Sequence, residues 1–115
     1  MSWLEQNLPD HDHDRPFVDL DAAEAAALIA RAGQDLLLLD VRTEGEHRRR
    51  HIEGSLLIPL GELGARWREL DPDRPTLVYC EHGVRSLQAV AWLAQCGFET
   101  LLNLRGGMSC WPPRA

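Results

Sequence analysis

The apolar residues of the chain gather in five short runs that have the length of β-strands. They cover residues 17–20, 36–39, 56–58, 75–79 and 98–104. The run from Leu36 to Leu39 contains no polar residue, which is typical of a parallel strand with both faces covered. Segments with helical signals separate the runs. The sequence therefore predicts an α/β fold with a five-stranded, mainly parallel sheet and helices on both faces.

Local signals place the helices. Asp21 followed by Glu24 forms a capping-box pattern, which predicts a helix over residues 22–32 that ends at Gly33. Residues 44–50 predict a short charged helix. Two further helices are predicted from apolar residues at helical spacing: Leu60, Leu63, Trp67 and Leu70, and then Leu87, Val90, Ala91 and Ala94 before Gly97. Trp67 is expected to pack in the core.

Length and composition indicate one domain without a disulfide framework. A chain of 115 residues can bury a core of its own. Residues 1–15 are expected to form a flexible N-terminal arm, and residues 16–115 the domain. His11-Asp12-His13-Asp14 could be offered as a metal site, but nothing fixes its geometry or supplies further ligands. We expect a solvated arm there, and neither a metal nor a cofactor in the protein.

The net charge and the cysteine positions limit the possible binding partners and the cellular compartment. The net charge of −6 argues against nucleic acid or an anionic membrane, because both would repel the chain. No apolar run approaches the roughly 20 residues of a membrane span. Three cysteines, at positions 80, 96 and 110, make neither a secreted disulfide pattern nor a Cys-x-x-Cys zinc site. We expect a cytoplasmic protein whose anion sites are local.

The candidate nucleophile is Cys80, which follows the apolar strand over residues 75–79 and opens a short polar loop before a helix. If the loop curls inward, its backbone N–H groups and the positive end of the helix dipole converge on the sulfur. Arg85 would add a fixed cation. Such surroundings favour the thiolate, which is the reactive form of cysteine.

Two other strand ends carry candidate site residues. Asp40 and Arg42 follow the run Leu36–Leu39, and ligands of open α/β sheets gather beyond the carboxyl ends of strands. A structural salt bridge or a loop anchor is an equally good interpretation of Asp40. The pair Gly106-Gly107 after the last strand implies a backbone that bends sharply or passes close to another loop.

Four blocks of the sequence together resemble the rhodanese family, in order and spacing, over about residues 16–113. The blocks are Asp40-Val41-Arg42 with Glu46, His51-Ile52-Glu53-Gly54-Ser55, Cys80-Glu81-His82-Gly83-Val84-Arg85-Ser86, and Leu104-Arg105-Gly106-Gly107-Met108 with Trp111. The resemblance is to single-domain rhodaneses. It implies a three-layer fold and a sulfurtransferase that takes a sulfane sulfur from a donor such as thiosulfate or a persulfide. The acceptor would be cyanide or a cellular thiol.

The resemblance also implies a role for each matching residue. Cys80 would be the nucleophile and would carry the sulfur as a persulfide. The amides of the loop that follows would stabilise the terminal sulfur; its residues are Glu81, His82, Gly83, Val84, Arg85 and Ser86. Arg85 and Arg42 would bind the donor anion or hold the loop, and Asp40 would orient the loop. Gly83 would be needed where the loop takes a positive φ.

Some residues depart from the family pattern or leave roles open. A carboxylate at Glu81 would repel a dianionic donor if it pointed inward, so thiosulfate is expected to be a poor substrate in that case. We expect Glu81 and His82 to face solvent. Cys96 is expected to be a small buried apolar group. Cys110 could accept sulfur from Cys80 or form a disulfide with it.

Three rival functions stay open. The first is a phosphatase or arsenate reductase on the same fold, but only four residues separate Cys80 from Arg85, and the phosphatases that resemble rhodaneses have one more. The second is a non-catalytic binding module, against which the presence of Cys80 argues. The third keeps the chemistry but passes the sulfur to a protein acceptor, and an exposed apolar patch beside the loop would favour it.

Overall fold

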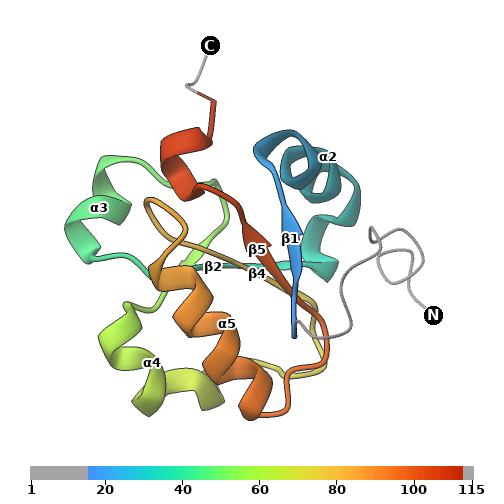
Figure 1. Ribbon diagram of the computed structural model, residues 1–115, viewed down its shortest axis with the longest axis vertical. Coiled ribbons are helices and arrows are strands. Elements are labelled where there is room, and N and C mark those ends of the chain that lie inside the picture. Colours follow the sequence, from blue (N-terminus) through green and yellow to red (C-terminus); the bar gives the residue numbers. More distant parts are fainter. Residues whose placement is uncertain (1–15, 113–115) are drawn as a thin grey trace.

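The computed structural model describes residues 16–112 and contains the predicted sheet. Its strands are β1 (Val18–Leu20), β2 (Leu37–Asp40), β3 (Leu56–Leu57), β4 (Thr76–Tyr79) and β5 (Leu101–Leu104). They lie in the order β1-β5-β4-β2-β3, and every neighbouring pair is parallel. The expected five-stranded parallel sheet is confirmed, with β4 at its centre (Figure 1).

Helices cover both faces of this sheet, so the domain has three layers. The α-helices are α2 (Ala22–Ala32), α3 (Glu44–Arg49), α4 (Leu60–Arg66) and α5 (Arg85–Gln95). Short 3₁₀ helices are η1 (Gly33–Asp35), η2 (Trp67–Glu69) and η3 (Gly107–Cys110). Helices α4 and α5 pack on one face, and α2 and η3 on the other (Figure 1).

Successive side chains along the buried strands point to opposite faces of the sheet, so the core is divided into two parts, one on each face. Leu38 and Leu77 pack with α2, while the next residues along each strand, Leu39 and Val78, pack with α4 and α5. All residues of β2, β4 and β5 are buried. The continuous apolar runs in the sequence are explained by this double coverage.

The first predicted helix has the expected boundaries. α2 spans Ala22–Ala32, and both halves of its capping box are present. The Asp21 carboxylate accepts from the Glu24 N–H at 2.8 Å, and the Glu24 carboxylate accepts from the Asp21 N–H at 3.0 Å. These bonds satisfy amides that the first helical turn leaves without a partner.

The third predicted helix differs in its length. Helix α4 ends at Arg66, and the chain then tightens into η2. Trp67 nevertheless packs against the core, edge-to-face with Phe98 at 6.5 Å between ring centroids.

The last predicted helix differs in its buried face. Helix α5 buries Ser86, Ala89, Val90 and Leu93. Leu87 and Ala91 are exposed, so the buried face that their spacing suggested is wrong in part. The helix begins at Arg85, directly after the Cys80 loop, and this start turns Ser86 toward the sulfur and Leu87 away from the core.

Two predictions, the flexible N-terminal arm and the His-Asp cluster within it, concern residues 1–15, which lie outside the described residues 16–112. Within the described part of the chain, no helix has the length and apolar character needed to cross a membrane.

Candidate active site

Cys80 lies directly after β4, where the chain turns into the loop that leads to α5. Its side chain is only 1% exposed. The sulfur accepts hydrogen bonds from the N–H of Gly83 at 3.0 Å and from the N–H of Ser86 at 3.3 Å. The Ser86 Oγ lies 3.4 Å from it. The loop therefore curls around the sulfur at the N-terminus of α5, and the buried thiol faces backbone donors as well as the apolar core.

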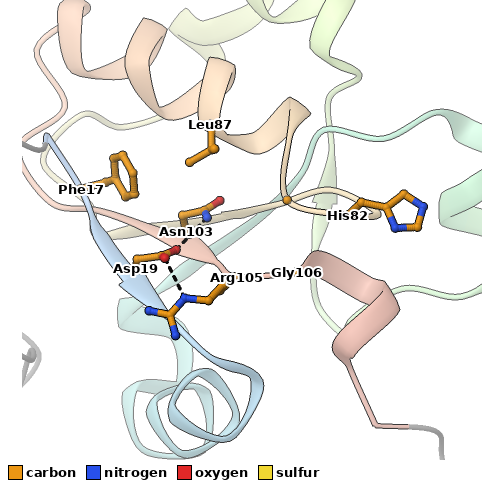
Figure 2. Close-up of a pocket in the computed structure, with 8 residues that line it drawn as sticks. Phe17, Asp19, His82, Leu87, Asn103, Arg105 and Gly106 are labelled. Atoms are coloured by element: carbon orange, nitrogen blue, oxygen red, sulfur yellow. Dashed lines mark hydrogen bonds and ion pairs between the residues drawn. The ribbon is translucent and has the colours of Figure 1, made fainter.

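Gly83 gives the loop its curl. Its φ is +90°, a conformation that side chains with a Cβ rarely adopt. A Cβ at this position would also lie 3.1 Å from the Gly106 nitrogen, so the two loops touch here. Both glycines line a pocket beside the loop, shown in Figure 2. The prediction that Gly83 takes a positive φ is confirmed.

The turn after β5 fixes the first two peptides of the loop. The Met108 N–H donates to the Cys80 carbonyl and the Ser109 N–H donates to the Glu81 carbonyl, both at 2.9 Å. Gly107, with φ +62°, has no room for a Cβ, which would collide with these same loop carbonyls. Because C=O and N–H point opposite ways across a trans peptide, the bonds turn the amides of Glu81 and His82 away from η3. The predicted close approach of the two loops is confirmed.

Arg85 does not stand as an isolated cation. Its guanidinium makes two hydrogen bonds of 2.8 Å to the carboxylate of Glu46 in α3. This pairing lowers the pKa of Glu46 from 4.5 to about 2 and raises the pKa of Arg85. Arg85 therefore ties α5 to α3, and Glu46 offsets most of the charge that was expected to act on the sulfur.

Asp40 and Arg42 form a fully buried ion pair. Arg42 Nη2 lies 2.8 Å from Asp40 Oδ2, and Asp40 Oδ1 also accepts from the Arg42 backbone N–H at 2.9 Å. Burial by itself would raise the pKa of Asp40, but hydrogen bonds from Arg42 and His47 outweigh it and lower that pKa. Burial would lower the pKa of Arg42, but its bonds to Asp40 and Glu81 raise it. Both groups are therefore held in their charged forms.

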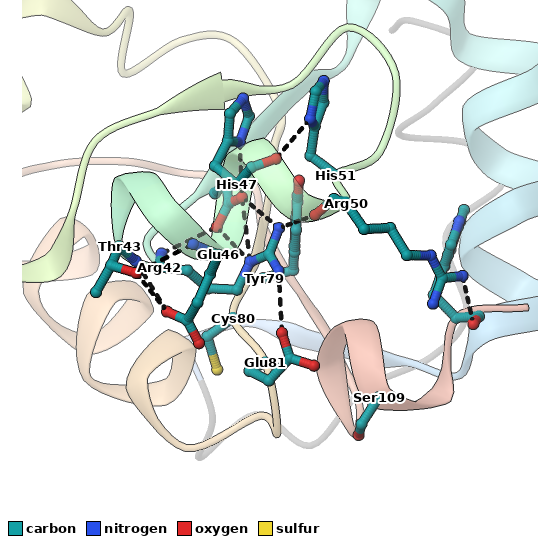
Figure 3. Close-up of polar contacts among 12 residues, drawn as sticks. Arg42, Thr43, Glu46, His47, Arg50, His51, Tyr79, Cys80, Glu81 and Ser109 are labelled. Atoms are coloured by element: carbon teal, nitrogen blue, oxygen red, sulfur yellow. Dashed lines mark hydrogen bonds and ion pairs between the residues drawn. The ribbon is translucent and has the colours of Figure 1, made fainter. Parts of the chain in front are cut away.

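Arg42 connects this pair to the residue beside the nucleophile. Its Nη1 donates to Glu81 Oε1 at 2.9 Å, and its Nη2 donates to the Arg50 carbonyl at 2.6 Å. The Glu81 side chain is 32% exposed and turned back toward Arg42 (Figure 3). The expectation of a solvent-facing Glu81 therefore holds only in part, because a buried guanidinium attracts the carboxylate. His82 is exposed, as expected.

A sequence model of the rhodanese-like domain matches residues 21–112. The chain belongs to the rhodanese-like domain family. A protein of Allochromatium vinosum named sulfurtransferase is 41% identical over 68% of this chain and 73% of its own length. The thiosulfate sulfurtransferase GlpE of Coxiella burnetii is 31% identical over 83% of this chain and 87% of its own. The resemblance read from the four sequence blocks is thereby confirmed.

A solved structure supports the same assignment. The rhodanese-related protein of Thermoplasma volcanium superimposes with a TM-score of 0.72 at 32% sequence identity, and the match covers 83% of this chain and 90% of that one. The sheet flanked by helices is thus the rhodanese-like fold.

The side chains around the sulfur of this rhodanese-like domain carry no excess of positive charge. Arg42 and Arg85 are paired with the carboxylates of Asp40, Glu46 and Glu81, and His47 also contacts Asp40. Any stabilisation of a thiolate or persulfide therefore comes from oriented backbone amides and the start of α5.

The other two cysteines lie apart from these contacts. Cys96 follows α5 and is half-buried against the core, so the expectation of a buried apolar group holds in part. Cys110 is exposed in η3, and its sulfur packs over Gly106. Both are free thiols. Within residues 16–112 no three His, Cys, Asp or Glu side chains are grouped to hold a metal ion.

Sequence reasoning missed two polar residues near this site. Asp19 of β1 and Asn103 of β5 are register partners and line the pocket of Figure 2. The available signal was Asn103 itself, a polar residue inside the apolar run Leu101–Leu104.

Proposed function

We propose that this rhodanese-like domain is a sulfurtransferase that carries a sulfane sulfur on Cys80. The observation that supports it most is the pair of backbone amides, from Gly83 and Ser86, that donate to the Cys80 sulfur. The relatives named sulfurtransferase support the same reaction class. Cys80 is the only cysteine of the three that lies at a strand end and inside a loop of donors within residues 16–112.

The reaction has two displacement steps. The Cys80 thiolate attacks the sulfane sulfur of the donor, the donor's S–S bond breaks, and the donor leaves with the bonding electron pair. With thiosulfate the leaving group is sulfite. An acceptor thiolate or cyanide then attacks the terminal sulfur of the Cys80 persulfide, and the electron pair of the broken S–S bond returns to Cys80. No external oxidant or reductant is needed.

The loop supplies the electrostatic part of catalysis. A persulfide places its negative charge one atom beyond the Cys80 Sγ, in the space that the loop of residues 81–86 surrounds. Preorganised amides that point at a developing charge stabilise it without reorganisation, and burial of the sulfur excludes competing water. In this proposal Arg42 and Asp40 hold the loop through Glu81 and do not bind the donor anion, since both are fully paired.

The charge balance favours a persulfide donor over thiosulfate. A dianion approaching Cys80 finds both Arg42 and Arg85 already paired with carboxylates, and Glu81 keeps one oxygen that Arg42 does not bind. An organic persulfide brings less charge to the same place. Replacing Glu81→Gln should raise the rate of loading from thiosulfate by about tenfold relative to loading from an organic persulfide.

Intact-mass spectrometry tests the proposal. Thiosulfate and glutathione persulfide are each incubated with the wild type and with the Cys80→Ser, Cys96→Ser and Cys110→Ser variants. We expect a mass gain of one sulfur atom that cyanide removes, lost only in Cys80→Ser. The absence of any adduct with either donor, together with hydrolysis of an aryl phosphate, would refute the proposal in favour of the phosphatase alternative.

A protein acceptor is the second candidate, and one observation favours it. Val84, the last loop residue before α5, is 64% exposed, and Leu87 follows it on the outer face of α5 at 43%. Apolar side chains beside a reactive loop are suited to contact with a partner. Replacing Val84→Asp should then weaken transfer to a protein thiol while transfer to cyanide changes less.

A further inference from the structure

Arg50 joins the end of α3 to the segment that follows η3. Its Nη2 donates to the Trp111 carbonyl at 2.7 Å and also to the Pro112 carbonyl. These partners lie 61 and 62 positions away in the sequence. Figure 3 shows the extended Arg50 side chain that makes this connection.

The two carbonyls that Arg50 binds follow the last turn of η3, which ends at Cys110. Carbonyls at the end of a helix lack partners within the helix. A guanidinium suits this position, because it only donates and carries the positive charge that the helix dipole favours there. Arg50 therefore holds the end of η3, while Met108 holds its start by packing in the core.

Helix η3 in turn holds the Cys80 loop. The Met108 N–H donates to the Cys80 carbonyl, and the Ser109 N–H donates to the Glu81 carbonyl. These two bonds set the direction in which the first two loop peptides face. Ser109 is exposed, so the core does not fix this part of η3. A displacement of the end of η3 therefore passes directly to the loop carbonyls.

A second route joins the same residue to the same loop. Arg42 Nη2 donates to the Arg50 carbonyl at 2.6 Å, and Arg42 Nη1 donates to Glu81 Oε1 at 2.9 Å. Arg50 is thus connected to Glu81 through its backbone and Arg42, and also through its side chain and η3. The route through Arg42 stays when only the Arg50 side chain is replaced. The role of that side chain can therefore be tested without breaking the buried ion pair.

We infer that Arg50 is a positioning residue for sulfur transfer at Cys80. The inference rests on the proposed function and adds a residue to it. Arg50 acts through η3: by fixing the end of this helix, it keeps the amides of Glu81 and His82 turned away from η3, where they stabilise the transferred sulfur. Small displacements of preorganised groups cost rate even when the replaced residue lies far from the reacting atoms.

Hydrogen exchange of backbone amides tests this connection without chemistry. Arg50→Met removes the donors, and Arg49→Met is the matched control, since Arg49 is also exposed at the end of α3 and its side chain makes no hydrogen bond or ion pair with residues 16–112. We expect the Met108 and Ser109 amides to exchange about tenfold faster in Arg50→Met, with Leu102 in the centre of the sheet unchanged. Unchanged exchange at Met108 and Ser109, or equal acceleration at Leu102, would overturn the inference.

Steady-state kinetics tests the consequence for transfer, with glutathione persulfide as donor and cyanide as acceptor. Arg50→Met should lower kcat about tenfold and change each KM by less than about twofold, because the positioned peptides act on the transition state. Arg50→Lys should recover part of this loss, since an ammonium group still donates to a carbonyl. Arg49→Met should match the wild type.

A merely structural role would give a different result. It would lower the thermal midpoint and the fraction of protein that takes up sulfur, and the loaded protein would keep the wild-type kcat. That result, a rise in KM alone, or an equal loss in Arg49→Met would overturn the inference.

The outcomes separate this inference from the proposed function. Sulfur on Cys80 with unchanged exchange and kinetics in Arg50→Met would leave the sulfurtransferase in place and refute the positioning role. Faster exchange at η3 in a protein that takes up no sulfur would refute the sulfurtransferase, and with it any part of Arg50 in transfer.

Discussion

Replacing Arg42→Met should strongly destabilise the domain, because it leaves the carboxylate of Asp40 buried without its main partner. Both side chains are fully buried, and Arg42 makes hydrogen bonds to Asp40, Glu81 and the Arg50 carbonyl. Removing one partner of a buried ion pair typically lowers the free energy of unfolding by about 3–5 kcal/mol. His47 still contacts Asp40 Oδ2 at 2.8 Å, which favours the lower end of that range.

Urea denaturation at neutral pH measures this effect through the free energy of unfolding. The double variant Asp40→Asn/Arg42→Met removes both charges and should be more stable than Arg42→Met alone by about 1–2 kcal/mol. Arg66→Met is the matched control, since Arg66 also pairs with two carboxylates but on the surface, and it should unfold like the wild type. A loss below about 1 kcal/mol for Arg42→Met, or a double variant that is no more stable, would refute the reasoning.

Three further predictions follow from the other contacts of the site and the fold. Gly107→Ala should abolish sulfur loading in the intact-mass assay and lower the thermal midpoint, because a Cβ collides with the loop carbonyls, whereas Gly45→Ala, in open space on α3, should load normally. The folded pKa of Glu46 is about 2 against 4.5 for the free group, so its contribution is present above pH 4.5 and is lost as the pH falls toward 2. Between neutral pH and pH 3, the free energy of unfolding of Glu46→Gln should therefore fall by about 1–2 kcal/mol less than that of the wild type. An equal fall in both proteins would contradict the pairing with Arg85. Asp21→Ala should cost about 1 kcal/mol of unfolding free energy through the lost helix cap, and an unchanged urea midpoint would contradict it.

The parts of the fold that local signals specify could be predicted from the sequence. The capping box at Asp21 and Glu24 gave α2 its boundaries, since both hydrogen bonds are made between residues three apart. The apolar run Leu36–Leu39 indicated a strand covered on both faces, and β2 is buried along its whole length. Cys80 at the start of its loop followed from the same kind of pattern.

The parts that depend on contacts between distant residues could not be predicted. Glu81 was expected to face solvent because nothing near it in sequence would hold it, and its partner Arg42 lies 39 positions away. Arg85 looked like a free cation for the same reason, since Glu46 is equally distant along the chain. The face of α5 depended on where the helix starts relative to the loop, which leaves Leu87 exposed beside the pocket.

The pocket was missed because its polar residues lie in different strands. Asp19 and Asn103 are 84 positions apart in the sequence and become neighbours only through the parallel pairing of β1 with β5. An asparagine inside an apolar strand indicated a nearby polar partner, but the sequence did not identify which residue that partner is.

The central claim is that the loop of residues 81–86 holds the transferred sulfur on Cys80. A crystal structure of the protein after incubation with a persulfide donor measures this most directly. We predict one additional atom bonded to the Cys80 Sγ, within hydrogen-bonding distance of at least two backbone nitrogens of the loop. An unmodified Cys80 with the sulfur on Cys110, or a terminal sulfur that points away from the loop amides, would contradict the account.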